Sequence, residues 1–363
     1  MRWTLCARRR TGSRAAPAAT GPCARSATRS WRSLRSARRA IRLSPELSIC
    51  IVSYNCRDLL ASCLRSIAET GIGLEVETIV VDNASADDTL EMLARDFPQV
   101  RVIASEENLG FAAGTNRAVA AASADVLLLL NPDTEVRPGA LRQLMEFIAS
   151  HPEVGACGPA AYGPEGELQP TCRAFPRLWL TVVAQLGLHR LFRRSRTFGA
   201  YEMTWWDHAD ARAVDWLSGV CIATRRSVWE RVGRLDESYF MYAEDLDWCY
   251  RLAQAALERW YLPDAEIVHH EGGSWGDASA KRILAAHRAN FRFFGKHYGH
   301  LAEVLQRILV AWGGLARGSF WNIMGPVLGA SRELISSYVV HFRVVEVAMA
   351  MDETWRETKD RRA

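Results

Sequence analysis

The chain has 363 residues and is 49% hydrophobic, which is enough to bury the core of one large or two ordinary domains. Its net charge of +4 conceals an asymmetry, because residues 1–45 hold twelve of the 45 basic residues and no acidic one. The remaining chain therefore carries 33 basic against 41 acidic residues. No apolar run reaches the roughly 18 residues that a membrane-spanning helix needs, which argues against an integral membrane protein.

The nine cysteines form no CxxC pair, and several lie in apolar runs. This usage favours buried, reduced thiols in a cytosolic protein over a disulfide framework or a zinc site.

Residues 1–45 are rich in Arg, Ser and Ala and have no periodic apolar face. We expect a disordered, dispensable tail or a stretch translated from an upstream start codon. The segment also resembles an organelle transit peptide, and its charge permits binding to nucleic acid. The folded part lacks the interleaved basic and aromatic residues of a nucleic-acid-binding surface, so no nucleic-acid partner is expected.

From about residue 47 to 160, short apolar strands alternate with amphipathic helices. Strands are predicted at 48–53, 78–81, 100–103 and 125–130. Helices are predicted at 57–69, at 112–122 and from Pro138 to Ser150. A further helix is predicted to begin at Ser85, where Asp88 would complete a capping box. Such a βαβ series predicts a parallel sheet with covering helices.

The second half is less regular. Residues 173–212 are expected to form a long mobile segment over the site. Strands are predicted at 214–223 and 266–269, and helices at 225–232, 244–254 and 282–297.

The first predicted strand ends in Ser53, Tyr54 and Asn55, where a dinucleotide-binding domain would carry GxGxxG. No glycine stands there, and no GK[ST] follows any strand. A bound metal or arginine side chains must therefore hold any phosphate groups.

Two polar segments follow the next strands. Asp82 could accept the imide N–H of a uracil or thymine ring, although Asp-Asn is also an ordinary strand-to-helix turn. Further on, Asn108 and Gly110 begin a segment that ends at Asn116; its glycine permits close approach of a ligand, and its amides offer hydrogen bonds. The alternative is a turn followed by a helix start.

The strand 125–130 runs into Asn131-Pro132-Asp133, where proline ends the ladder. Asp133 then lies at the edge where open α/β sheets bind ligands. A carboxylate there can hold a divalent metal, which in turn can hold a diphosphate. The alternative is an ordinary turn.

Glu244 and Asp245 open a predicted helix, whose dipole favours ionised carboxylates able to act as a general base. The alternative is helix capping, with Asp247 and Arg251 as an i,i+4 ion pair. His269 ends the last predicted strand and could complete a metal shell, or it could be purely structural.

Seven segments in order resemble family 2 glycosyltransferases of the GT-A fold, most closely bacterial rhamnosyltransferase-like members that build cell-surface polysaccharides. They are residues 48–55, 80–85, 108–116, 131–133, the SG, RR and VG-LDE elements of 218–237, 240–251 and 269–274. The resemblance implies an α/β GT-A domain at 46–298, which is a Rossmann-like, mostly parallel sheet flanked by helices. A C-terminal helical region follows at 299–363.

The resemblance also implies roles. Asp82 would bind the donor base, and Asp133 would hold Mg²⁺ or Mn²⁺ on the diphosphate, with His269 completing the shell. Asp245, beside Glu244, would deprotonate the acceptor hydroxyl. The donor-binding set comprises Ser53, Tyr54, Asn55, Asp82, Asn108, Gly110, Asn116 and Asn131. Asn131 replaces the first Asp of a DxD motif and is expected to contact the ribose or a water.

The function implied is an inverting transfer of a sugar, with rhamnose expected, from a nucleoside-diphosphate donor to a saccharide or lipid-linked acceptor. A UDP-hexose donor, or a catalytically inactive sugar-binding homologue, remains open. Stacking on the acceptor is assigned to Trp205, Trp206 or Trp216. Trp216 could as well be core, and the sequence does not address the oligomeric state.

The segment 301–349 offers Leu305, Ile308, Leu309 and Trp312 on one helical face, with Arg307 and Arg317 available for anionic head groups. Peripheral binding to the cytoplasmic face of the plasma membrane is one expectation. Ordinary helices packed on the domain are the other.

Overall fold

The computed structural model describes residues 45–270, 279–327 and 344–349. The expectations for the Arg-rich tail, and for the part of the last motif at 271–274, lie outside these residues. All elements below belong to the unit Ser44–Ala363.

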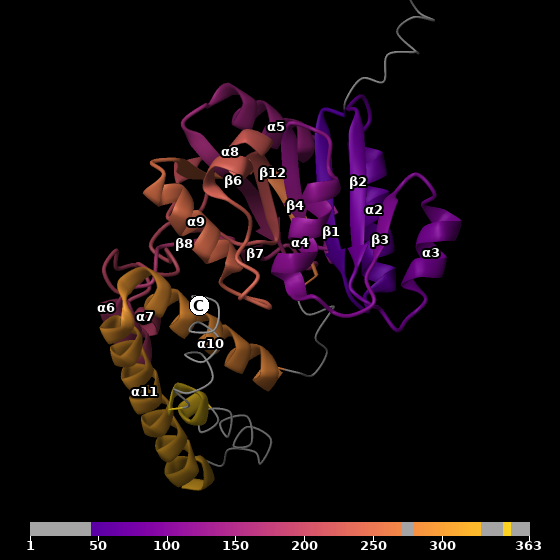
Figure 1. Ribbon diagram of the computed structural model, residues 1–363. Coiled ribbons are helices and arrows are strands. Elements are labelled where there is room, and N and C mark those ends of the chain that lie inside the picture. Colours follow the sequence, from indigo (N-terminus) through magenta and orange to yellow (C-terminus); the bar gives the residue numbers. More distant parts are fainter. Residues whose placement is uncertain (1–44, 271–278, 328–343, 350–363) are drawn as a thin grey trace, which may run out of the picture. The chain divides into compact units, whose positions relative to one another are not determined.

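The described residues form a ten-stranded sheet and a two-stranded one (Figure 1). The strands are β1 (Leu47–Ser53), β2 (Val76–Asp82), β3 (Arg101–Ala104), β4 (Val126–Leu130), β5 (Thr134–Val136), β6 (Val154–Tyr162), β7 (Leu168–Gln169), β8 (Cys172–Arg173), β9 (Arg212–Ala213), β10 (Trp216–Leu217), β11 (Cys221–Arg225) and β12 (Glu258–His269). The large sheet has the order β3-β2-β1-β4-β11-β6-β12-β5, with β7 on β6 and β9 on β12, while β10 pairs with β8.

Helices cover both faces of the large sheet, and a further group of helices lies beyond one edge of it (Figure 1). They are α2 (Arg57–Thr70), α3 (Thr89–Asp96), α4 (Gly110–Ala121), α5 (Ala140–Ser150), α6 (Leu178–Gln185), α7 (Leu188–Leu191), α8 (Arg226–Val232), α9 (Glu244–Gln254), α10 (Ser279–Tyr298) and α11 (His300–Val327). Residues 344–349 are also helical.

The strand β1 shows how the sheet divides the core. All seven of its residues are buried, and successive side chains point to opposite faces. Ile49 and Ile51 join the cluster that contains residues of α2 and α5, whereas Cys50 joins the cluster of α4, α8 and α9. Because both faces are covered by helices, the α/β fold expected from the sequence is confirmed.

The polar strand ends meet at one edge of the sheet. β1, β2 and β4 are mutually parallel, so Ser53, Asp82 and Leu130 end side by side. β11 is antiparallel to β4, which brings its first residue, Cys221, opposite Leu130. β12 is parallel to β6, and both run in the direction of β4, so His269 ends at the same edge.

Two predicted elements were wrong in detail. No helix begins at Ser85, because its hydroxyl accepts the amide of Asn55 (3.0 Å) and its amide donates to Asp82 (3.0 Å). The helix starts at Thr89, without the predicted side-chain capping bond. The single strand at 214–223 is split at Ser218 and Gly219, because their amides bond to Thr171 and Asp245 instead of to a neighbouring strand.

The C-terminal helical region is present. Asp247 of α9 is fully buried and contacts Lys296 (2.6 Å) and His297 (2.7 Å) of α10, and the predicted ion pair to Arg251 is confirmed at 2.9 Å. The contacts of Asp247 with Lys296 and His297 therefore hold α10 against α9.

The helix α11 contacts α10 and α6. The expectation that Arg307 faces lipid was wrong, because this side chain is buried, pairs with Glu303 (2.7 Å) and donates to the carbonyl of Val347. Of the described helices, none is both long and apolar enough to cross a membrane.

Of two further expectations, one is confirmed and the other stays a prediction. The seven cysteines in the described ranges are free and buried, as predicted. Within 173–212 lie β8, α6 and α7, and Arg173, Tyr201 and Glu202 of this segment line the cavity described below. Its mobility stays a prediction.

Candidate active site

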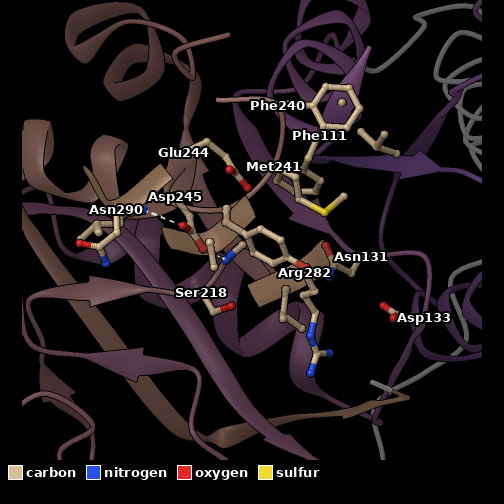
Figure 2. Close-up of a pocket in the computed structure, with 18 of the residues that line it drawn as sticks. Phe111, Asn131, Asp133, Ser218, Phe240, Met241, Glu244, Asp245, Arg282 and Asn290 are labelled. Carbon is tan, nitrogen blue, oxygen red and sulfur yellow. Dashed lines mark hydrogen bonds between the residues drawn. The ribbon is translucent and has the colours of Figure 1, made fainter. Parts of the chain in front are cut away.

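A cavity of about 730 Å³ opens at the edge where the strands end. In Figure 2, Asn131 and Asp133 lie on one side of it and Glu244, Asp245 and Asn290 on the other, with Arg282 between them. The predicted site residues that line it are Tyr54, Asn108, Gly110, Asn131, Asp133, Glu244, Asp245 and His269.

The register of β12 against β5 brings Asp133 and His269 together. His269 lies opposite Thr134, the residue after Asp133, and the amide of His270 donates to the carbonyl of Asp133 (2.9 Å). The Nε2 atom of His269 lies 3.5 Å from Oδ1 of Asp133, although 136 residues separate them along the chain.

Gln169 orients the imidazole of His269. Its amide nitrogen donates to the carbonyl of His269 (3.1 Å), so its amide oxygen is the atom that lies 2.8 Å from Nδ1. Nδ1 therefore carries a proton, which in a neutral imidazole leaves the lone pair on Nε2, the atom that faces Asp133. Metal-binding histidines commonly have an outer partner of this kind.

Asp133 is buried, and its Oδ1 atom has no hydrogen-bond partner among the described residues. An unpaired buried carboxylate oxygen beside an imidazole lone pair is a donor set that suits a divalent cation. No cluster of three or more His, Cys, Asp or Glu side chains suited to a metal occurs in the described ranges. The remaining ligands of a bound cation would come from substrate or water.

Asn131 is held by its main chain. Its amide donates to Val220 (2.9 Å), and its carbonyl accepts the hydroxyl of Thr134 (2.7 Å). The side-chain amide is left to line the cavity.

Glu244 and Asp245 begin α9 after a left-handed turn, with φ values of 70° at Tyr242 and 63° at Ala243. Strained backbone of this kind costs of order 1–3 kcal/mol and is concentrated at functional sites. The turn places both carboxyl groups in the cavity wall.

Asp245 accepts two backbone hydrogen bonds, from Gly219 to Oδ2 and from Leu246 to Oδ1, each 2.7 Å long. Glu244 is buried, and its Oε2 atom lacks a hydrogen-bond partner among the described residues.

Burial raises the pKa of both carboxyl groups and so opposes the effect of the helix dipole that the sequence predicts. The pKa of Glu244 lies well above its usual range, because the charge of Asp245 adds to the effect of burial. The rise in the pKa of Asp245 is opposed by the amides of Gly219 and Leu246 and by the positive charge of Arg173. Of the two, Glu244 therefore takes up a proton more readily and Asp245 holds a negative charge more readily.

Gly110 has a structural reason to be glycine. Its φ is +78°, and a Cβ atom would lie 2.3 Å from the carbonyl oxygen of Phe240. That carbonyl also accepts the amide of Phe111 (2.8 Å), so Gly110 lets the 240–243 loop pack on α4. Asn108 caps the same turn by accepting the amide of Gly110 (3.0 Å).

Four predicted donor-binding residues lie outside the cavity lining: Ser53, Asn55, Asp82 and Asn116. The amide of Asn116 is fully used by Leu235 and Glu237 at 2.9–3.1 Å, and Asn55 accepts the amide of Ala86 (2.7 Å). The side chains of Asn116 and Asn55 therefore connect neighbouring segments of the chain by hydrogen bonds. Asp82 is buried, but its Oδ1 atom has no partner in the described part of the chain.

Of the three tryptophans predicted to stack on the acceptor, only Trp216 lines the cavity. Its indole N–H is bonded to the carbonyl of Ala174 (3.0 Å). Trp206 is buried against His208 and Tyr261, and neither it nor Trp205 lines the cavity.

Sequence reasoning missed Arg173, Tyr201, Arg282 and Asn290 as lining residues. Each is a single polar or aromatic residue without a motif, so no local pattern distinguishes it. Only the return of β8, of the turn at Tyr201 and of α10 to the sheet edge reveals them.

A family model described as "Glycosyl transferase family 2" matches residues 48–204. An "N-acetylglucosaminyl-diphospho-decaprenol L-rhamnosyltransferase" of Mycobacterium tuberculosis strain ATCC 25618 / H37Rv is 32% identical over 253 residues, covering 65% of this chain and 80% of the relative. The chain belongs to glycosyl transferase family 2. It is therefore a glycosyltransferase.

This family 2 enzyme is also similar to a second curated relative and to a solved structure. "Rhamnosyltransferase WbbL" of Escherichia coli strain K12 is 34% identical over 85 residues, covering 23% of this chain and 26% of the relative. A solved mannosyltransferase from Pyrobaculum calidifontis, in complex with GDP-Man and Mn²⁺, superposes with a TM-score of 0.53 at 16% identity, covering 92% of this chain and 96% of that one. The latter likeness establishes the fold alone. The family match ends before Asp245 and His269.

Proposed function

We propose that this glycosyltransferase moves L-rhamnose from a nucleoside-diphosphate donor to a lipid-linked saccharide, with inversion at the anomeric carbon, in cell-surface polysaccharide synthesis. The observation that carries the proposal is that one cavity holds both an unpaired carboxylate beside a histidine, Asp133, and a charged carboxylate held by backbone amides, Asp245. The acceptor in the name of the M. tuberculosis relative, an N-acetylglucosaminyl-diphospho-lipid, supports the choice of acceptor.

Asp133 and His269 would hold a divalent cation, Mg²⁺ or Mn²⁺, at the donor end of the cavity. When bound, such a cation neutralises the charge that develops on the departing nucleoside diphosphate. Asn131 and Tyr54 line the wall on this side and would orient the donor. The unpaired Oδ1 atom of Asp82 supports its proposed contact with the donor base.

At the acceptor end, Asp245 would accept the proton of the attacking hydroxyl. The hydroxyl oxygen forms the new bond to the anomeric carbon as the bond to the diphosphate breaks, and the electron pair leaves with the diphosphate. The pKa of Glu244 is raised well above its usual range, so this group takes up a proton more readily than Asp245, which lessens the negative charge that would repel the incoming oxygen. One displacement from the face opposite the leaving group inverts the configuration, and no covalent sugar–enzyme intermediate is needed.

A lipid-linked acceptor requires contact with a membrane, which we place at α11. Leu305, Ile308 and Trp312 share one face of this helix and are exposed, as expected from the sequence. We propose peripheral binding at the cytoplasmic face of the plasma membrane.

The test is transfer from a panel of nucleotide sugars to a short-chain analogue of N-acetylglucosaminyl-diphospho-lipid, followed by mass spectrometry of the product. Addition of a deoxyhexose from dTDP-rhamnose supports the proposal. Transfer only from a UDP-hexose would replace rhamnose with the alternative donor. Absence of both transfer and donor hydrolysis across the panel would favour an inactive, sugar-binding homologue.

A further inference from the structure

The helices α6 and α7 expose more apolar surface than a packed helix pair needs. Trp179, Val182 and Leu186 follow one another at helical spacing and are all exposed, with Leu186 retaining 52% of its surface. Leu191 at the end of α7 retains 74%, and Phe192 beside it 46%. Contiguous exposed apolar side chains of this kind mark an interaction surface.

The same segment is strongly basic. Residues 173–201 contain six arginines and no acidic residue. Four of these arginines are exposed and lie on or directly after α7: Arg190, Arg193, Arg194 and Arg196. The apolar side chains of α7 are thus surrounded by positive charge that no nearby acidic residue of the segment neutralises.

The helix α11 extends this surface. It packs on α6 through Thr181 to Gln306 (2.7 Å) and Arg317 to Gln185 (2.6 Å). Burial lowers the pKa of Arg317, and repulsion from the nearby positive charge of Arg190 lowers it further. The basic groups of the two helices therefore gather together.

The exposed apolar row of α11 has helical spacing and consists of Leu301, Leu305, Ile308, Trp312 and Leu315. The only acidic residue of α11 is Glu303, which is buried and bonded to Arg307. In Figure 1, α6 lies beside α11, and α7 packs against α6, so the helices that carry the two apolar rows form one layer.

We propose that α6, α7, residues 192–196 and the exposed row of α11 form one docking surface for an anionic lipid bilayer. Apolar side chains within a field of arginines match the two parts of such a membrane, acyl boundary and anionic head groups. A second copy of the chain fits less well, because a symmetric dimer would bring these arginines against one another.

This inference rests on the proposed lipid-linked acceptor for its purpose. Arg173 lines the cavity, and α6 begins five residues later along the chain. A bilayer that holds the docking surface would therefore lie next to the wall of the cavity that contains Asp245 and Arg173. The α6–α7 part of the docking surface would position the enzyme on the bilayer, whereas the sequence pattern predicted a membrane contact for α11 alone.

The first experiment measures sedimentation of the full-length enzyme with vesicles of phosphatidylcholine alone or mixed with phosphatidylglycerol. The variants R193E/R194E and L191S/F192S should each lose binding to the anionic vesicles. Because an arginine near an anionic surface contributes about fivefold in affinity, the double charge reversal should weaken binding at least about 25-fold. High salt should release the wild type.

Control variants carry a single change of each kind elsewhere on the surface. Arg142→Glu alters an exposed arginine on α5, and Ile72→Ser removes an apolar side chain that is 80% exposed. Both should bind vesicles like the wild type. Equal binding by the α7 variants and these controls would overturn the proposal.

Because the Arg-rich residues 1–45 could bind anionic vesicles by themselves, a local measurement is also needed. Hydrogen–deuterium exchange of the full-length enzyme with anionic vesicles should slow in peptides from 178–196 and 300–320, and not in peptides from α2. Unchanged exchange at both segments would contradict the docking surface. A wild type that self-associates through these peptides without lipid would also overturn it.

The α7 variants should keep full transfer to a soluble acceptor analogue and lose transfer to acceptor embedded in vesicles. Vesicle binding without transfer to any acceptor would refute the proposed function and leave the docking surface standing. Transfer to both acceptors with unchanged rates in the α7 variants would refute the docking surface alone.

Discussion

At one end of the cavity, Asp133 faces His269 across 3.5 Å with an unpaired oxygen; at the other, Asp245 receives two backbone amides and lies next to Glu244. Both ends present a carboxylate at the same edge of the sheet. They differ in their neighbours, an imidazole lone pair in one case and a proton-holding carboxyl group in the other.

The difference shows how environment assigns chemistry to one residue type. A carboxylate with an open oxygen and a nitrogen ligand beside it suits a cation. A carboxylate with a pKa raised by burial, whose negative charge is stabilised by amides and by Arg173, suits proton transfer. The comparison predicts that changes at the two ends have separable effects.

The largest effect is expected for Asp245→Asn. Removing a general base costs about 10²–10⁴-fold in rate, and a sole base should fall at the top of that range. Donor affinity, measured by calorimetry, should change little because the donor lies at the other end. Wild-type turnover in this variant would remove Asp245 from the mechanism.

At the other end, chelation with EDTA should abolish activity, and Mg²⁺ or Mn²⁺ should restore it. Asp133→Ala should weaken donor binding as well as rate, and His269→Ala should raise the metal concentration needed for half-maximal rate. Gln169→Leu, which removes the partner of the imidazole, should weaken metal affinity about 10–100-fold. Full activity in EDTA with no metal in the protein would contradict this assignment. If His269→Ala changes only stability, that histidine is structural.

The pH dependence should separate the ends further. Asp245 must be unprotonated to act, so the rate falls as pH drops through its pKa. Removing the positive charge in Arg173→Gln should raise that pKa and move the acidic limb of kcat/KM to higher pH. Arg142→Gln on α5 is the control and should leave the limb in place. A limb that stays put or moves to lower pH in Arg173→Gln would exclude this electrostatic contact.

A smaller effect is expected for Gly110→Ala. The added Cβ meets the carbonyl of Phe240, so the 240–243 loop before Asp245 must shift, at a cost of about 1–3 kcal/mol in unfolding free energy. Its kcat should fall while its metal requirement stays the same. Gly139→Ala provides the control, since φ there is also positive, +87°, but the nearest atom lies 3.6 Å away in a flexible side chain. Equal losses in both variants would attribute the effect to backbone conformation alone.

The smallest effect concerns residues 1–44. They hold no acidic residue, no periodic apolar face and none of the seven motifs. Their deletion should leave the melting temperature and the turnover with soluble acceptor unchanged. A truncated enzyme that does not fold or turn over would show that the tail has a role in the catalytic unit.

Sequence reasoning worked where chemistry and periodicity coincide. The apolar run before Asp133 and the helix start at Glu244 fixed both cavity ends, because buried parallel strands and helix N-termini have strong local signals. Sequence reasoning failed where one residue type could serve either of two purposes, to bind a ligand or to join two loops. Asn116 has the amide expected of a ligand contact, and only the fold reveals that Leu235 and Glu237 use it fully.

Long-range pairing could not be predicted. The contact of Gln169 with His269 depends on the register of β7 on β6 and of β6 on β12, and a single-residue slip would separate them. Similarly, Arg307 belongs to a pattern that favours lipid contact, but the helix at 344–349 accepts its hydrogen bonds.

The most direct test of the two-ended cavity is the anomeric configuration of the product, determined by NMR after transfer from a donor of known configuration. If the donor end holds the diphosphate while Asp245 activates the acceptor from the opposite side, one displacement occurs and every new linkage is inverted. A product that retains the donor configuration would require two displacements, and it would contradict the assignment of Asp245 as the base of a single step.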